Sequence, residues 1–257
     1  MDSTDRSIRL YSFVTSPYGW KVHTYLLYKR LSFDLSYISP VRARKELPLG
    51  HQIPVLQIGN EAKADSSSIG IWLDQQFPDS PRILPADELL RAEVMEADRW
   101  ISDVLIPTLF YSEYPVFNRS LSRTLTNTLK MGSCIHHTSR GGLHPGLRLL
   151  WPLIIRQAGF IKRLVLPLKA QVSVGQCRAQ AFEWLESRLQ RQPYIVATET
   201  PSLADLSAWP QLYVPHALGL KGMDDYLEYP SITRWEKQIR SQIITSDLPP
   251  LIPASLR

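Results

Sequence analysis

The sequence predicts two parts, a mixed α/β domain followed by an all-helical domain. Up to about residue 80, short apolar runs and helix patterns alternate in the order strand, helix, strand, strand, strand, helix. After Pro85 the apolar residues recur only at helical spacing. Pro78, Pro81 and Pro85 form a stiff connector between the two patterns. We therefore expect one domain at residues 1–82 and a second at residues 83–257.

The first half of the α/β part is predicted to be a strand, a helix and a second strand. Residues 8–14 are apolar and aromatic, which predicts a strand. Ser16 then reads as a helix cap and Pro17 as the first residue of the helix. The helix is expected to run from about Pro17 to Lys29, and residues 33–38 then return as a strand. Such a βαβ unit normally has a right-handed crossover.

The second half is predicted to be a hairpin and a helix. Residues 53–58 read as a strand, and the tight turn Gly59-Asn60 leads to a second arm at residues 62–64. Asp65-Ser66 then begins an amphipathic helix that stops at Phe77-Pro78. The α/β part is complete at this point.

Three segments of the helical part give separate expectations. A buried stripe is predicted on a helix that Pro107 kinks or ends, while residues 132–146, rich in glycine and serine, read as an irregular exposed loop. Ser202 and Asp205 have the spacing of a capping box at the start of a later helix. The predicted stripe is Leu90, Val94, Ala97, Ile101 and Val104, and the residues expected to face inward after the capping box are Leu206, Trp209 and Leu212.

Composition indicates a folded protein without a disulfide framework. Hydrophobic residues make up 44% of the 257 residues and charged residues 21%. Cys134 and Cys177 are isolated, which predicts buried thiols. The N-terminus has no basic and apolar leader pattern, so we expect a cytoplasmic location. His136, His137 and His144 fit no standard metal spacing, so no metal is expected.

Positive charge is concentrated in one segment. From Arg119 to Arg178 there are ten Lys or Arg residues and no Asp or Glu. Within it, residues 147–168 are apolar but too often interrupted to span a bilayer. We expect a buried helix pair with solvated charged edges, and peripheral contact with an anionic membrane is the alternative. No nucleic-acid partner is expected, because an aromatic stacking platform is missing.

Taken in order and spacing, these motifs resemble the glutathione transferase superfamily over nearly the whole chain, with an N-terminus similar to the serine-type classes zeta, theta and tau. The resemblance implies an α/β thioredoxin-like N-terminal domain that binds glutathione, an all-α C-terminal domain and a homodimer. Glutathione would be the co-substrate. The residues that carry the resemblance are Leu10-Tyr11-Ser12, Ser16, Trp20, Val22, Ile53-Pro54-Val55-Leu56, Asp65-Ser66, Ser202 with Asp205, and Tyr229-Pro230 with Trp235.

The resemblance implies a catalytic role for Ser16. A free cysteine thiol has a pKa of about 8.5, so glutathione is mostly protonated at neutral pH. A hydroxyl that donates to the sulfur at a helix N-terminus would lower this pKa. From the residues alone, Ser16 can equally be a helix cap. Thr15 and Tyr11 are the fallback hydroxyls, although Tyr11 is better explained as a strand residue in the core.

The glutathione-binding residues implied by the resemblance lie in two segments. Pro54, if cis, would turn the Val55 backbone outward to pair with the peptide as an added strand, whereas a trans proline would only begin a strand. Asp65 and Ser66 would meet the γ-glutamyl end, or else form an ordinary helix cap. The implied residues are Gln52, Ile53, Pro54, Val55, Asp65 and Ser66, with Lys45 or His51 as alternatives to Gln52 at the glycine carboxylate.

A second substrate is expected between the domains. Tyr18, Phe110, Tyr111 and Tyr114 are candidates for this pocket, and the same aromatics can also be core residues. The implied activity is conjugation or isomerisation of a small hydrophobic electrophile in detoxification, because a serine favours these reactions over disulfide exchange. The alternative is a non-catalytic relative that binds a hydrophobic ligand, an anionic membrane or a protein partner.

Overall fold

A computed structural model describes residues 7–50, 52–113, 121–139, 142–165, 167–168, 173–243 and 248–256. The strands are β1 (Ile8–Ser12), β2 (Asp34–Tyr37), β3 (Val55–Ile58) and β4 (Glu61–Ala64). The first helices are α1 (Pro17–Tyr28), α2 (Ala43–Glu46), α3 (Ser66–Gln76), α4 (Glu88–Trp100), the π-helical η2 (Ile101–Leu105) and α5 (Ile106–Glu113). They are followed by α6 (Leu121–Thr138), α7 (Pro145–Leu149), α8 (Trp151–Arg156), the π-helical η3 (Ile161–Val165), α9 (Val174–Leu189), α10 (Leu203–Ala217), the 3₁₀ helix η5 (Asp225–Glu228), α11 (Pro230–Ile243) and the 3₁₀ helix η6 (Ala254–Leu256).

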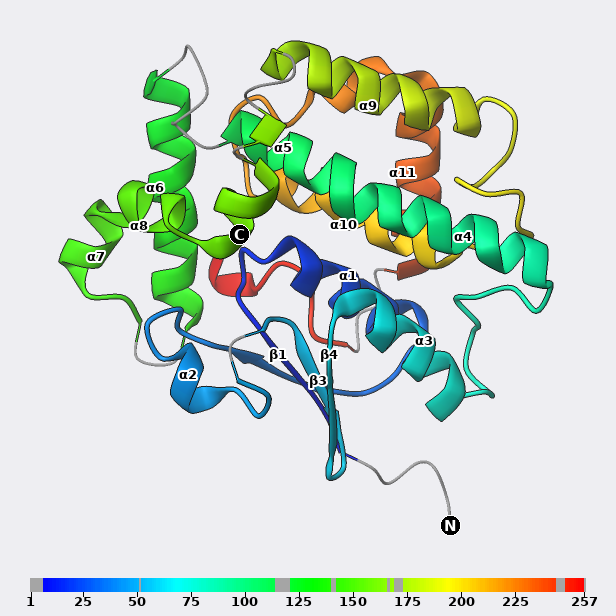
Figure 1. The fold of residues 1–257 in the computed structure, drawn as a ribbon, viewed down its shortest axis with the longest axis horizontal. Coiled ribbons are helices and arrows are strands. Elements are labelled where there is room, and N and C mark those ends of the chain that lie inside the picture. Colours follow the sequence, from blue (N-terminus) through cyan, green and yellow to red (C-terminus); the bar gives the residue numbers. More distant parts are fainter. Residues whose placement is uncertain are drawn as a thin grey trace.

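The four strands form one sheet in the order β2-β1-β3-β4. β1 pairs with β2 in parallel, whereas β3 is antiparallel to both β1 and β4. Figure 1 shows α1 and α3 between this sheet and the helices that follow. The predicted strands and helices up to residue 77 are therefore confirmed, with their ends shifted by a residue or two. The short helix α2 was not predicted.

The main core lies where α1 packs between the sheet and α10. All but one of the α1 residues are buried, because the helix has the sheet on one side and the helical domain on the other. Leu10, Leu26 and Leu56 are fully buried there. A smaller cluster of Ile38, Leu47 and Val55 forms a separate apolar core, to which α2 contributes Ala43. The N-terminal sheet is thus held on the helical domain through α1.

The helix that begins at Glu88 does not end at Pro107, so of the two expectations for this proline, a kink or an end, the second is wrong. α4 continues into the π-helical η2 and then into α5, whose second residue is Pro107. Pro107 cannot donate an N–H to the preceding turn, and the π-helical turn directly before it is where the regular α-helical bonding is interrupted. The wider π turn also shifts the stripe, so Leu105 is buried and Val104 is exposed.

The region after residue 120 differs most from the predictions. Residues 132–138 belong to α6 rather than to a loop, and Gly132 lies against the ring of Trp151. Residues 147–168 do not form a buried helix pair but the short helices α7, α8 and η3, with exposed leucines. The glycines and serines of residues 132–138 wrongly indicated a loop. The short helices after them are held on the core by the buried Trp151, Ile161 and Val165.

α10 confirms the predicted capping box. The Asp205 carboxylate accepts from the Ser202 N–H at 2.9 Å and from the Ser202 hydroxyl at 2.7 Å. It also accepts from the Trp235 indole at 2.9 Å, which ties α11 to the start of α10. Leu206, Trp209 and Leu212 are buried, as predicted, and so are Cys134 and Cys177. Among the described residues, no helix is long and apolar enough to cross a bilayer.

Candidate functional site

The turn between β1 and α1 presents the Ser16 hydroxyl at a helix N-terminus. Ser16 is the cap residue of α1, with φ −85° and ψ 116°, and its Oγ accepts a hydrogen bond from the Gly19 N–H at 3.1 Å. A serine hydroxyl both accepts and donates, so its proton remains available for another acceptor. The partial positive charge of the helix end favours an anion at this place.

Three hydrogen bonds hold this turn in place. The Trp20 indole donates to the Val14 carbonyl at 2.7 Å, and the Gln211 amide of α10 donates to the Pro17 carbonyl at 3.1 Å. The Tyr18 hydroxyl donates to the Ser102 carbonyl of η2 at 3.0 Å. Two of the bonds come from the helical domain, so both domains position the hydroxyl of Ser16.

The peptide bond between Ile53 and Pro54 is cis, as expected. Val55, the residue after it, pairs with Tyr11 of β1 on one side and with Ala64 of β4 on the other. A residue between two strands has no free edge for an added strand. The register therefore argues against the expected role of the Val55 backbone and leaves Ile53, which precedes β3, at the open end.

Asp65 has an unusual backbone conformation for a residue with a side chain. Its φ is 72° and its ψ 116°, a combination that costs about 1–3 kcal/mol in general and is concentrated at functional sites. Asp65 Oδ1 accepts from the Ser68 N–H at 2.8 Å and so caps α3. Ser66, the first residue of α3, is buried. A second helix N-terminus is thus fixed beside an exposed carboxylate.

The register brings these segments to one end of the sheet. Tyr11, Val55 and Ala64 are opposite one another on three neighbouring strands. The turn to Ser16 follows β1, the cis bond precedes β3, and Asp65 follows β4. Gln52 and Lys45, candidates for a ligand carboxylate, are exposed, and His51 lies outside the described residues.

A buried polar cluster under this end of the sheet was not predicted. Lys21 Nζ of α1 lies 2.8 Å from Asp98 Oδ1 of α4, and the two side chains are 0% and 1% exposed. Lys21 also donates to Ser102 Oγ at 2.9 Å, and Asp98 accepts from Ser207 Oγ of α10 at 2.5 Å and from Ser67 Oγ of α3. Lys21, which stands between Trp20 and Val22 on a largely apolar helix, was the sequence signal that could have indicated a buried cation.

The aromatic residues predicted for a second pocket are brought together only in part. Phe160, which precedes η3, contacts Tyr18 and Phe110 edge-on, with ring centroids 5.9 Å and 5.2 Å apart. Burial is the main cause that raises the pKa of Tyr18, with Asp103 next. Tyr111 is buried, and Tyr114 lies outside the described residues. Phe160 gave no sequence signal, because nothing distinguishes it from the other apolar residues of its segment.

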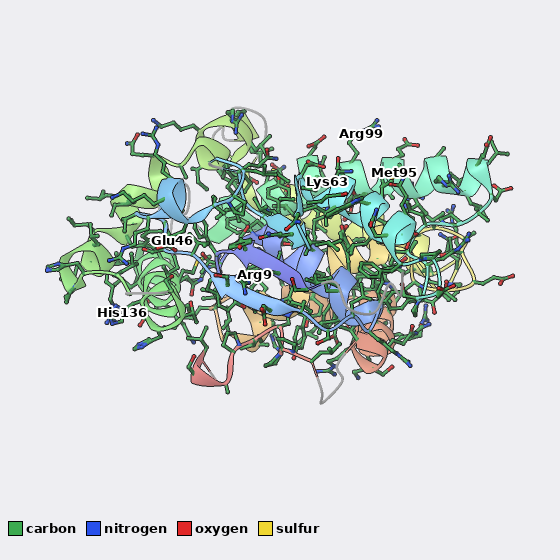
Figure 2. The ribbon with its side chains drawn as sticks, turned by 90° about the horizontal axis from the view of Figure 1, so that it is seen from below. Arg9, Glu46, Lys63, Met95, Arg99 and His136 are labelled. Atoms are coloured by element: carbon green, nitrogen blue, oxygen red, sulfur yellow. The ribbon has the colours of Figure 1, made fainter. Side chains whose placement is uncertain are left out.

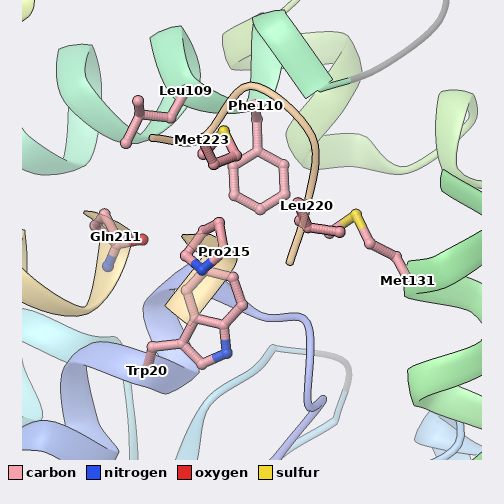
Figure 3. Close-up of a pocket in the computed structure, with 8 residues that line it drawn as sticks. All are labelled: Trp20, Leu109, Phe110, Met131, Gln211, Pro215, Leu220 and Met223. Carbon is pink, nitrogen blue, oxygen red and sulfur yellow. The ribbon is translucent and has the colours of Figure 1, made fainter. Parts of the chain in front are cut away.

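A small apolar cavity adjoins the inner side of Phe110. Figure 3 shows that Trp20 of α1 and Met131 of α6 lie around it, and its space is about 10 Å³, the room of a single water. A substrate does not fit there. The cavity is lined by Trp20, Leu109, Phe110, Met131, Gln211, Pro215, Leu220 and Met223.

A thioredoxin-like sheet joined through α1 to an all-helical domain, with a cis-proline and two helix N-termini at one end, is the fold of the glutathione transferases. Residues 10–81 match the model of the glutathione S-transferase N-terminal domain. Residues 10–81 are therefore similar to a glutathione S-transferase N-terminal domain, and the chain as a whole has the glutathione transferase fold, with its class unresolved.

Individual relatives are distant. Glutathione S-transferase 1 of Dianthus caryophyllus is 29% identical over 146 residues, which are 54% of this chain and 63% of that protein. The structure of a β-etherase from a Sphingobium strain has a TM-score of 0.59 at 20% identity and covers 91% of this chain and 95% of its own. The structure of human glutathione transferase theta-2, in complex with glutathione, has a TM-score of 0.60 at 19% identity. The match covers 93% of this chain and 83% of that chain. These structures support the fold.

Proposed function

We propose that the protein is a glutathione transferase, which activates the thiol of glutathione for attack on a small hydrophobic electrophile. The observation that carries this proposal is the convergence of Ser16, the cis bond at Pro54 and the strained Asp65 at one end of the sheet. The match of residues 10–81 to the glutathione S-transferase N-terminal domain, and the likeness to a theta-2 structure with bound glutathione, support glutathione as the co-substrate.

Ser16 would act on the sulfur. Its Oγ is occupied as an acceptor by the Gly19 N–H, so the hydroxyl proton is free to donate to a thiolate. A charge-assisted hydrogen bond and the positive end of α1 both favour the thiolate over the thiol. Both effects lower the pKa of the glutathione thiol toward neutral pH. Ser16 would thus bind the anion and needs no general base.

The peptide would lie along the open end of the sheet. The backbone of Ile53 is the segment before β3 that can pair with an extended ligand, in place of Val55. The γ-glutamyl carboxylate would meet Ser66 and the N–H groups of α3, and its amine the exposed Asp65 carboxylate. Gln52 or Lys45 would meet the glycine carboxylate.

The electrophile would lie against the wall formed by the contacting rings of Tyr18, Phe110 and Phe160. Edge-on rings of this kind favour a flat apolar or aromatic substrate. Conjugation and isomerisation both fit this wall, and the homodimer implied by the family resemblance stays a prediction.

The test is a glutathione titration near neutral pH that follows the ultraviolet absorbance of the bound thiolate. The wild type should show a thiolate signal, and Ser16→Ala should lose it, with at least about tenfold lower kcat/KM toward an aryl halide. The matched control is Ser173→Ala, because Ser173 caps α9 far from the site. Both variants should lose about 1 kcal/mol of stability, since each removes a helix cap.

Two results would contradict the proposal. Glutathione binding with an unchanged thiolate signal in Ser16→Ala would move the role to another hydroxyl, and Thr15→Ala would test that residue. An absence of glutathione binding in the folded wild type would reject the enzyme and favour a non-catalytic relative. In that case the fold would serve a different ligand or partner.

A further inference from the structure

The end of the molecule formed by α7 and α8 has an outward face that its own fold leaves uncovered. Leu149, Leu150 and Leu153, here called the leucine tip, are 73%, 51% and 63% exposed. The opposite face of the same segment is occupied, because Trp151 is buried against Gly132 of α6. The segment formed by α7 and α8 is therefore apolar on its outward face as well as its inward face. An exposed apolar patch of this kind marks a site of interaction with an external apolar surface.

The surface helix α11 does not share this pattern. The exposed side chains of α11 are charged, with Arg234, Lys237 and Arg240 facing solvent, and its apolar residues are buried. This is the usual arrangement for a helix at the surface of a water-exposed domain. Leu89 of α4 and Leu125 of α6 are exposed singly, whereas the leucine tip places three exposed leucines within five residues.

The charge around the leucine tip has one sign. No Asp or Glu occurs between Arg119 and Arg178, and the exposed Lys162 of η3 and the half-buried Arg148 of α7 flank the leucines in sequence. The described side chains of this segment form no ion pair with an acid except for Arg178, which binds Asp225. Positive charge beside the tip is thus available to an external anion.

The position of the tip is the third observation. In Figure 1 and Figure 2, α7 lies at the outer end of the molecule, on the same side as α2. α2 adds the exposed Arg44 and Lys45, with Glu46 as its acidic residue. A protruding apolar tip with a basic surround can enter a deformable headgroup layer, whereas a protein partner would need a matching groove.

From these observations we infer that the leucine tip docks on the surface of an anionic lipid bilayer. Leu149, Leu150 and Leu153 enter the boundary between headgroups and acyl chains, and the basic residues beside them bind lipid phosphates and carboxylates. The contact is peripheral. The inference does not rest on the proposed catalytic function, because it concerns a different surface and a different ligand.

The test is co-sedimentation of the full chain with vesicles of phosphatidylcholine alone or mixed with phosphatidylserine. The wild type should bind the mixed vesicles and be released by salt. Leu149→Ser with Leu153→Ser should lower the partition coefficient at least about tenfold, and Lys162→Gln about fivefold. The matched controls are Leu89→Ser, on an exposed leucine of α4, and Lys237→Gln on α11, which should bind like the wild type.

Three results would overturn the inference. The first is wild-type protein that stays in the supernatant with both kinds of vesicle. The second is equal binding by the wild type and the double leucine variant. The third is a double variant whose mass by size-exclusion chromatography with light scattering falls to that of a smaller assembly, with vesicle binding unchanged. That last result would show that a second copy of the chain covers the leucines.

Discussion

His23 is a histidine that the folded protein keeps neutral. Its side chain is buried in α1, Nε2 lies 2.9 Å from the Pro249 carbonyl, and the ring meets Phe33 edge-on. Burial lowers the pKa of His23 to about 4, against an upward effect of the hydrogen bond to Pro249. The C-terminal segment is therefore held on α1 by an uncharged imidazole.

A dependence of stability on pH follows from this shift. Between about pH 4 and pH 6.5 the unfolded chain binds a proton at this residue that the folded protein does not, so stability falls as pH falls through this window. We expect His23 to lower the free energy of unfolding by about 2 kcal/mol near pH 5 relative to pH 7, and urea unfolding at the two pH values measures this difference. His23→Gln should remove this part of the slope, whereas the exposed His137→Gln should keep it. Equal slopes in the wild type and His23→Gln would contradict the prediction.

Single residues were predictable from sequence where their role depends on local chain geometry. Ser16 and Asp65 were found because a capping residue is followed at fixed spacing by its helix, and the structure places both at helix starts. Phe160 and Lys21 were not found, because their roles depend on contacts with residues far away in the chain. Local sequence carries no information on such contacts.

At the scale of elements, α1 connects every part of the candidate site. It begins at Ser16, contributes Lys21 to the buried ion pair with Asp98 of α4, and packs along α10. Two charges buried together lose their hydration, and hydroxyls of Ser67, Ser102 and Ser207 replace part of it. Removal of one charge leaves the other buried without a counter-ion.

We predict that Lys21→Met lowers the free energy of unfolding by about 3 kcal/mol, because Asp98 then stays buried without its cation. Methionine keeps the length of the apolar stem. The control is Arg9→Met, since Arg9 and Asp34 form an exposed pair, 52% and 68% accessible, and should leave stability unchanged. Chemical denaturation of the two variants measures both effects. Equal losses in the two variants would show that the buried pair has no special role.

The elements that sequence analysis placed wrongly have two physical causes. The π-helical η2 inserts one residue into a turn, so the period that pointed to Val104 is correct before it and wrong after it. In residues 147–168 the pattern is apolar on all sides, and apolar content alone does not distinguish burial from an uncovered surface. Regular elements with one apolar face, such as those up to residue 77, were predictable.

On the scale of the whole molecule, the connector between the two domains is tied down rather than free. Lys29 of α1 donates to Asp74 of α3 at 2.7 Å and to the Pro81 carbonyl at 3.0 Å. Asp74 in turn accepts from the backbone N–H groups of Ile83 and Leu84. Because α1 also packs on α10, each domain buries apolar surface against the other. Neither domain is expected to be stable alone.

We therefore predict a single cooperative unfolding transition for the whole chain. Tryptophan fluorescence and far-ultraviolet circular dichroism should give the same midpoint in urea, and the calorimetric and van't Hoff enthalpies should agree. Trp20 and Trp72 report on the α/β domain and Trp209 and Trp235 on the helical domain. Two separated transitions would show that the domains fold independently. The Lys21→Met variant, which weakens their interface, is the most sensitive background for this measurement.

The segment that begins with α8 joins two places that are otherwise distinct. Leu153, in the leucine tip, and Phe160, in the aromatic wall beside Tyr18, are seven residues apart in one continuous piece of chain. With the tip docked and the wall binding the electrophile, both as proposed, a lipophilic compound dissolved in the bilayer would be concentrated at the same short segment that carries the wall. Its reaction rate would then follow its mole fraction in the lipid rather than its total concentration in the sample.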